Sequence, residues 1–272
     1  MKIALIQQTA SDDIKSNIDK AVNSVKEAAG NRANIICFAE LAFTPFYPQK
    51  PVAENKIELA ETIPGPITDV FSKLAKEFGV VIILNLYEKD GSNFYDSSPV
   101  INTDGSIIGV TRMIHITDYA CFHEKGYYDP GNTGTPVYET KFGKIGIAIC
   151  YDRHYPEYMR ALALKGADVV FIPQAGSVGE WPEGLYEAEL RVASFQNGYF
   201  TALCNRVGEE ERLTFAGESF VCNPEGIVIA QAKAGKEEIL YCNIDTDKVK
   251  TSHARNLFLP DRRPELYKDW LK

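Results

Sequence analysis

The stretch 142–174, FGKIGIAICYDRHYPEYMRALALKGADVVFIPQ, constrains the fold more than any other part of the chain. Its apolar run Ile145–Ile149 predicts a buried strand that ends at Cys150. Pro156, a residue favoured at first helical positions, begins a helical pattern, and the run Asp168–Ile172 predicts the next buried strand. Strand, turn, helix and strand in this order form a βαβ-like unit with Cys150 at its turn.

The position of Cys150 is typical of a nucleophile. A side chain at a strand end near a helix N-terminus lies close to backbone N–H groups and to the positive end of the helix dipole, which favour a thiolate. Free cysteine is also among the most buried residue types and usually acts as a small hydrophobic side chain. The local pattern leaves these two interpretations of Cys150 balanced.

A second apolar run, Asn34–Glu40, ends in a carboxylate and is followed by a loop that contains prolines and Tyr47. Strands of α/β folds commonly present site residues at such ends, although Glu40 is equally well interpreted as a cap or surface carboxylate. Strand-helix-strand units alternate with antiparallel segments, which predicts sheets covered by helices in one α/β domain over 1–272. The charged and aromatic tail 246–272 has no place in this core pattern, so we expect it to pack on a partner subunit.

Composition excludes several function classes for this chain of 272 residues. A net charge of -8 argues against a nucleic-acid partner or an anionic membrane surface. No apolar stretch approaches the ~20 residues of a membrane span, and the N-terminal MKIALIQQ predicts a strand rather than a signal peptide. Six scattered cysteines favour reduced thiols in a cytoplasmic protein. Because GxGxxG, Walker A, HExxH and CxxC patterns are missing, we expect no cofactor and no metal.

A buried carboxylate can act as the base for a thiol. Desolvation raises the pKa of the carboxyl towards neutrality, so it can accept the thiol proton and later return it to a leaving amine. This chemistry suits amides and nitriles. A papain-like arrangement would instead use a histidine base such as His115, His123 or His154, but a polar core or loop histidine is the commoner interpretation of each.

Several motifs resemble those of the nitrilase (carbon–nitrogen hydrolase) superfamily, and the resemblance extends from Lys2 to Asp245. Within the superfamily the motifs are most similar to those of β-ureidopropionases and other amidohydrolases of N-carbamoyl amino acids or amines. The matching segments are GIAICYDRHYPEYMRALALKGADVVFIPQA around Cys150, CFAE at 37–40, HEKGYYDPGNTGTPVYET at 123–140 and CNRVG at 204–208.

This resemblance implies a four-layer αββα sandwich that assembles as a homodimer or larger homo-oligomer. It also implies cofactor-free hydrolysis of a non-peptide C–N bond through a thioester-type intermediate. Cys150 maps onto the nucleophile, Glu40 onto the general base and Glu124 onto an additional glutamate beside them. By the same likeness, the backbone N–H of Tyr151 would stabilise the developing oxyanion.

Three further residues are candidates for the substrate pocket. Arg153 can hold a substrate carboxylate with its planar fork, and a surface or helix-capping cation is the alternative. Gln174 and Tyr47 are expected to line the pocket. We therefore expect a small-molecule substrate, first an N-carbamoyl amino acid or amine and second a primary aliphatic amide.

The segment GVTRMIHI at 109–116 departs from the family pattern, since it has Met113 where the triad lysine is expected. Methionine has no charge and no donor, so it cannot stabilise an oxyanion. Arg112 would point to the opposite face of a strand, which leaves His115 or Lys125 to supply a cation. The alternatives are an active hydrolase with a cation from elsewhere, a pseudoenzyme that binds an amide-like ligand, and an engineered change at position 113.

Overall fold

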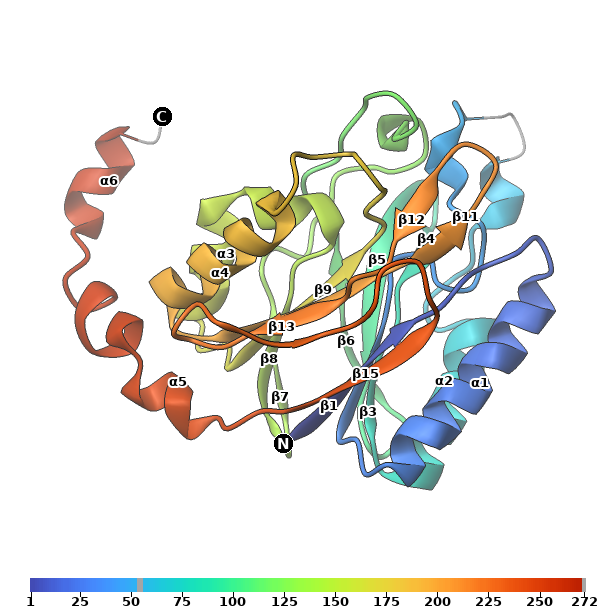
Figure 1. Cartoon of the computed structure of the whole chain (residues 1–272). Coiled ribbons are helices and arrows are strands. Elements are labelled where there is room, and N and C mark those ends of the chain that lie inside the picture. Colours follow the sequence, from blue (N-terminus) through green and yellow to red (C-terminus); the bar gives the residue numbers. More distant parts are fainter. Residues whose placement is uncertain (53–55, 271–272) are drawn as a thin grey trace.

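The computed structural model describes residues 1–52 and 56–270, and two β-sheets form its centre (Figure 1). The seven-stranded sheet has the order β15-β1-β2-β3-β5-β4, with β6 also paired to β5. Its strands are β1 (Lys2–Gln7), β2 (Ile35–Phe38), β3 (Val81–Ile83), β4 (Leu86–Asp90), β5 (Asn93–Ile101), β6 (Ile107–Arg112) and β15 (Glu238–Asn243). The six-stranded sheet has the order β14-β13-β10-β9-β8-β7. Its strands are β7 (Val137–Thr140), β8 (Gly143–Ile147), β9 (Val169–Gln174), β10 (Phe200–Asn205), β13 (Phe220–Cys222) and β14 (Val228–Gln231).

Helices cover the outer face of each sheet. The α1 and α2 helices pack on the seven-stranded sheet, and α3 and α4 pack on the six-stranded sheet (Figure 1). These helices are α1 (Ile14–Gly30), α2 (Pro66–Phe78), α3 (Pro156–Leu164) and α4 (Leu185–Asn197). Smaller elements are the β11–β12 hairpin (Val207–Glu209, Thr214–Ala216) and the short helices η1 (Tyr47–Gln49), η2 (Lys56–Leu59), η3 (Glu124–Gly126) and η4 (Cys150–His154).

Three apolar clusters separate the four layers. One lies between the two sheets and contains side chains from both, such as Leu5 of β1 and Phe171 of β9. The other two lie between each sheet and its helices, with Phe71 of α2 in one and Leu162 of α3 in the other. The expected αββα sandwich is therefore confirmed, including the βαβ unit β8-α3-β9.

Local sequence explains where the helices begin and end. The Asp13 side chain accepts a hydrogen bond from the backbone N–H of Ser16 and so caps α1. Pro66 occupies the first turn of α2, and Gly79 ends that helix at φ 63°, a conformation that glycine adopts without steric cost. The α3 helix likewise begins at Pro156, as the sequence predicts.

The chain ends in a segment that extends away from the sandwich (Figure 1). It contains α5 (Asp247–Thr251), the wide turn η5 (Ala254–Phe258) and α6 (Pro264–Trp270). The η5 turn contacts α4, where Phe258 and Phe195 have ring centroids 5.4 Å apart, whereas α6 buries none of its residues. None of the described helices combines the length and the apolar character needed to cross a membrane.

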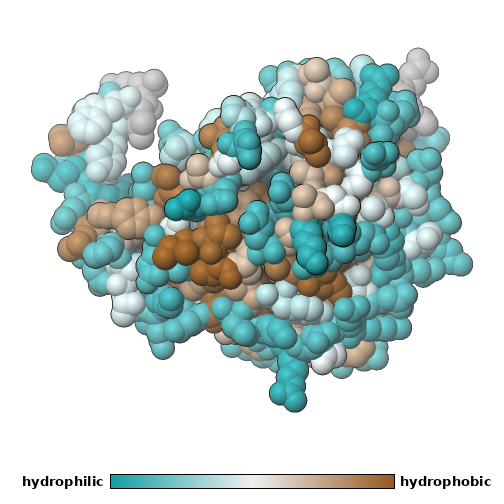
Figure 2. Space-filling model, in the orientation of Figure 1, coloured by the Kyte–Doolittle hydropathy of each residue, from teal (hydrophilic) through white to brown (hydrophobic). Residues whose placement is uncertain are grey.

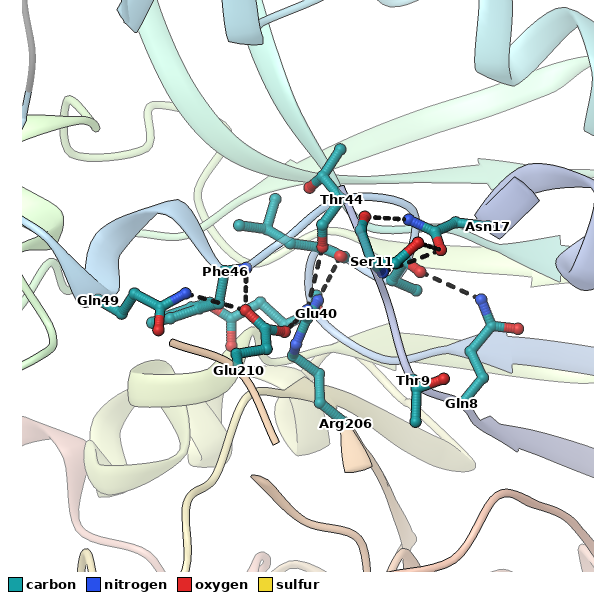
Figure 3. Close-up of polar contacts among 12 residues, drawn as sticks. Gln8, Thr9, Ser11, Asn17, Glu40, Thr44, Phe46, Gln49, Arg206 and Glu210 are labelled. Carbon is teal, nitrogen blue, oxygen red and sulfur yellow. Dashed lines mark hydrogen bonds and ion pairs between the residues drawn. The ribbon is translucent and has the colours of Figure 1, made fainter. Parts of the chain in front are cut away.

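Arg206, directly after β10, joins the two sheets through the loop that follows β2 (Figure 3). Its guanidinium donates to the backbone carbonyls of Glu40 and Leu41 and to that of Thr44. It also pairs with Glu210, whose other oxygen accepts hydrogen bonds from the Phe46 backbone N–H (2.8 Å) and from a Gln49 side chain (3.0 Å). Because this network is buried, it fixes the backbone from which the Glu40 side chain extends.

We expect Arg206→Ala to lower the free energy of unfolding by about 3–5 kcal/mol, because the Glu210 carboxylate and three carbonyls would stay buried without their partner. Urea denaturation followed by circular dichroism measures the change. Lys250→Ala is the matched control, since Lys250 pairs with Asp247 in full contact with solvent, and its denaturation midpoint should not move. Equal midpoints for all three proteins would show that the network contributes nothing to stability.

Candidate functional site

Glu40, Glu124 and Cys150 come together between the sheets. Glu40 follows β2, Glu124 begins η3 and Cys150 follows β8, so three separate segments supply one side chain each. One ligand atom from each residue lies within 4.8 Å of the other two, and the exposed fractions are 0%, 0% and 5%. The structure thus juxtaposes the three residues that the sequence nominated for catalysis, while their individual roles stay predictions.

The backbone at Cys150 is strained. Its φ of 43° lies in the left-handed region, which is uncommon for a residue with a Cβ and clusters at functional sites. The Arg153 guanidinium donates to the Cys150 carbonyl at 2.7 Å and so holds the turn in place. Tyr151 follows in the first turn of η4, where backbone N–H groups have no acceptor within the helix.

Burial determines the protonation of this cluster. Desolvation, together with the nearby Glu124 charge, raises the pKa of Glu40 from its ordinary value of 4.5 to about 8. Burial and the charges of Glu40 and Glu124 likewise raise the pKa of the Cys150 thiol. The sequence-based expectation of a thiolate stabilised by the helix dipole is therefore wrong, because burial and two acidic neighbours outweigh that dipole. The resting residue is a thiol that needs a base.

Asp96 is a third buried carboxyl group at the site, and it was missed in the sequence. It extends from β5, and its pKa is raised by burial and by the charge of Glu40. Asn85 donates to Asp96 at 2.5 Å and accepts from the backbone N–H of Leu41 at 2.8 Å, so it connects Asp96 to the residue after Glu40. A lone acid within the otherwise uncharged strand segment Tyr95–Asn102 was the available signal.

A fourth acid, Glu180, lies beside the cluster and was also missed. It follows β9 in the loop before α4, and its charge contributes to the raised pKa of both Cys150 and Glu124. Its two oxygens accept hydrogen bonds from the hydroxyls of Tyr119 and Tyr186, each at 2.5 Å. No local sequence pattern distinguishes Glu180 from the other acidic loop residues.

The residues expected to bind substrate lie around the cluster in different ways. Arg153 is buried and donates to Glu189 and Gln174 as well as to Cys150, a geometry that favours a bracing role over a free carboxylate-binding fork. Gln174 is buried, and its side-chain NH₂ group has no partner. Tyr47 is half-buried and lines a cavity of about 440 Å³ whose lining includes none of Glu40, Glu124 and Cys150. Its role and those of Gln174 and Tyr151 stay predictions.

Neither cation proposed to replace a lysine at position 113 reaches the site. The segment 109–116 was expected to be a strand, but β6 ends at Arg112. Beyond it the Asp152 carboxylate accepts hydrogen bonds from the backbone N–H of His115 and from the His115 ring, the latter at 2.7 Å. Lys125 is exposed on η3. Arg112 points away, as expected, and pairs with Glu88 at 2.6 Å.

Glu40, Glu124 and Cys150 also form a set of potential metal ligands. Two carboxylates and a thiolate at this spacing can hold a divalent ion such as Zn²⁺ once they are deprotonated. No metal was expected from the sequence, because motifs such as HExxH consist of ligands that lie close together in the chain. These three ligands are separated by long segments.

We expect Glu40→Gln to stabilise the protein more at pH 8 than at pH 5. A carboxyl whose pKa is raised by folding stabilises the folded state only while it is protonated, so stability is lost as pH rises from about 4.5 towards 8. Glutamine cannot ionise and removes this loss. Urea denaturation at both pH values measures the difference, and Glu139→Gln, at an exposed position, is the control. A gain that is the same at both pH values would contradict the raised pKa.

Comparisons with known proteins agree with this architecture. Residues 2–254 match the carbon–nitrogen hydrolase family model. An N-carbamoylputrescine amidase from Arabidopsis thaliana is 35% identical over 280 residues, covering 98% of this chain and 93% of that protein. A citrullinase from Francisella tularensis subsp. tularensis is 33% identical over 279 residues, covering 98% of this chain and 96% of that protein.

A β-ureidopropionase from Arabidopsis thaliana is 38% identical over 204 residues, covering 74% of this chain and 49% of that protein. The crystal structure of a carbon–nitrogen hydrolase from Helicobacter pylori G27 superposes with a TM-score of 0.94 at 32% identity, covering 100% of this chain and 98% of that chain. The resemblance stated from the motifs is thereby confirmed. The chain belongs to the carbon–nitrogen hydrolase family of the nitrilase superfamily, and its relatives named above include amidohydrolases of non-peptide C–N bonds.

Proposed function

We propose that this protein hydrolyses an N-carbamoyl amino acid or amine, with a primary aliphatic amide as the second substrate class, by using Cys150 as nucleophile and Glu40 as base. The observation that carries the proposal is the convergence of a thiol and two carboxyl groups within 4.8 Å in a buried site. The names of the relatives, which include an N-carbamoylputrescine amidase and a citrullinase, support the carbamoyl class. No cofactor takes part in the proposed reaction.

The proposed reaction moves one proton in each half. Glu40 accepts the thiol proton while the Cys150 sulfur forms a bond to the carbonyl carbon. The protonated Glu40 then gives that proton to the leaving nitrogen as the C–N bond breaks, which leaves a thioester-type intermediate and free amine or ammonia. Water then loses a proton to Glu40 and bonds to the carbonyl carbon, and the C–S bond breaks as Glu40 returns that proton to sulfur, which releases the acid and re-forms the Cys150 thiol. A base pKa of about 8 suits both directions of this transfer near neutral pH.

Backbone geometry supports the proposed oxyanion contact. Tyr151 follows Cys150 directly and carries an N–H in the first turn of η4. A donor of this kind typically contributes ~10²–10³ in rate when it is directed at the developing charge.

Intact-mass analysis after brief incubation with N-carbamoyl compounds and aliphatic amides tests the nucleophile. We expect the native chain to gain the mass of an acyl group and to release ammonia, and Cys150→Ala to do neither. Cys121→Ala removes a more accessible thiol and should behave like the native chain. A mass gain that survives in Cys150→Ala would eliminate Cys150 as the nucleophile.

The second candidate function is a pseudoenzyme that binds an amide-like ligand without turnover. The methionine at position 113 favours it, since neither His115 nor Lys125 supplies the missing cation. Saturable binding of the panel compounds, without adduct and without ammonia, would support the pseudoenzyme over the hydrolase.

We also propose that the C-terminal segment packs on a second copy of this chain, so that the protein is a homodimer or larger. The α6 helix buries nothing in its own chain, and its Leu266 and Trp270 are 39% and 68% exposed. Figure 2 shows apolar surface on the body beside this segment. The cytoplasmic location stays a prediction that the six free cysteines support.

Removal of residues 264–272 should lower the oligomeric state. This truncation spares η5 and its contact with α4, so the sandwich itself keeps its packing. Size-exclusion chromatography with light scattering gives the molar mass of the full chain and of the truncated chain. An identical mass for both would refute packing through α6.

A further inference from the structure

The cluster around Cys150 contains more acid than the proposed reaction needs. We call Glu40, Asp96, Glu124 and the Cys150 thiol the acid pocket. Among the side chains that the structure describes, those of residues 1–52 and 58–270, no hydrogen bond or ion pair joins a lysine, arginine or histidine to these four groups. Burial of several acids without a cation is costly, so the pocket favours a ligand that brings positive charge.

The two nearest arginines are committed elsewhere. Arg153 donates to the Cys150 carbonyl, to Gln174 and to Glu189, and its guanidinium stacks on the Tyr186 ring. Arg206 donates to loop carbonyls and pairs with Glu210. Both stabilise backbone and neighbouring side chains, and neither directs a donor at the acid pocket.

Met113 occupies the adjacent position with an apolar side chain. Its backbone N–H donates to the Asp96 carbonyl at 2.9 Å, which continues the β5–β6 ladder by one residue. Residues opposite one another in an antiparallel ladder share a face, so Met113 lies on the same face as Asp96. Its side chain is fully buried in the apolar cluster between the sheets and supplies no positive charge to the acid pocket.

The acid pocket also has unused hydrogen-bonding capacity. Both carboxyl oxygens of Glu40 and one of Glu124 have no partner, although each side chain is 0% exposed. The buried Tyr128 hydroxyl has no partner either, and the charges of Asp96, Glu40 and Glu124 all act on it. Buried polar groups in native proteins are normally paired, so these atoms indicate a ligand with several N–H donors.

We propose that the acid pocket binds and hydrolyses small amidines or guanidines, whose planar cation carries its N–H donors and its positive charge at the reacting carbon. This inference rests on the proposed role of Cys150 as nucleophile. Carboxylates pair with the nitrogens of such a cation as they pair with the fork of an arginine, and Glu40 and Glu124 each bring a carboxyl oxygen within 4.8 Å of the Cys150 sulfur. The near-complete burial of Cys150 restricts the reacting group to a small one.

The reaction balances without a further reactant. Glu40 takes the Cys150 proton, the sulfur bonds to the amidinium carbon, and the π electron pair moves onto nitrogen, which gives a neutral adduct. Glu40 returns the proton to one nitrogen, the C–N bond breaks, and ammonia leaves a cationic thioimidate. Water loses a proton to Glu40 and adds to the carbon. The C–S bond then breaks, so that the thiol re-forms, an amide or urea is released, and the proton on Glu40 leaves with ammonia as ammonium.

The charge at the tetrahedral carbon explains why this substrate class fits. A thiolate that attacks an amide produces an oxyanion, for which the Tyr151 backbone N–H is a candidate donor but to which the acid pocket supplies no cation. A thiolate that attacks an amidinium produces a neutral adduct. The arrangement that disfavours the first reaction therefore favours the second.

Two isosteric pairs test the inference, namely acetamidine with acetamide and methylguanidine with methylurea. Each is incubated with the purified full chain in the presence of EDTA, and ammonia and the amide or urea product are measured by enzymatic assay and proton NMR. We expect kcat/KM for the cationic member to exceed that of the neutral member by about tenfold or more. Cys150→Ala should abolish both activities.

Variants report on the origin of the preference. Met113→Lys places an ammonium on the Asp96 face and should reverse the preference, while Met113→Leu, which keeps an apolar side chain, should preserve it. Glu124→Gln should lower turnover of the amidine more than that of the amide. The native chain's own ratio decides the question if Met113→Lys fails to fold.

The outcomes separate this inference from the proposed function. A neutral member hydrolysed as fast as its cationic partner, with a Cys150 adduct, would overturn the inference and leave the proposed hydrolase intact. Turnover of the cationic members would support both. Absence of adduct and ammonia with every compound, N-carbamoyl compounds included, would overturn both.

Discussion

The burial of three carboxyl groups beside one thiol is the constraint on which this structure depends. Charged groups without partners are expensive to bury, so the carboxyls retain protons to unusually high pH, and the pKa of Glu40 reaches about 8. The surrounding structure keeps these groups from separating. Asn85 connects Asp96 to the backbone after Glu40, and Arg206 holds that backbone against the second sheet. Stability and acid–base chemistry are thus opposed within one site.

Local sequence patterns were sufficient for much of the architecture and for the three central residues. Apolar runs mark the strands and helices, and residues such as Pro156 and Gly79 lie where helices begin or end. Cys150 and Glu40 lie at the ends of apolar runs that form strands. Asp96 escaped notice because its neighbour in space, Glu40, follows another strand of the sheet, and strand order cannot be read from periodicity.

The sequence also did not predict which side chains pair with one another. Arg153 and His115 both carry donors that suit a substrate, yet Glu189 and Asp152 engage them in the structure. Those carboxylates are brought near by the packing of α4 and by η4, which a one-dimensional pattern does not contain. Similarly, the local dipole argument for a Cys150 thiolate omitted the acids that three-dimensional packing places beside it.

The edge of the seven-stranded sheet has a consequence for biosynthesis. Residues Lys2–Gln7 pair with Glu238–Asn243, so this sheet joins two segments that are far apart in the sequence. The strand that is made first has one side unpaired while the long intervening segment emerges from the ribosome. The high sequence separation of this contact predicts slow folding and a period in which an exposed strand edge depends on chaperones for protection from aggregation.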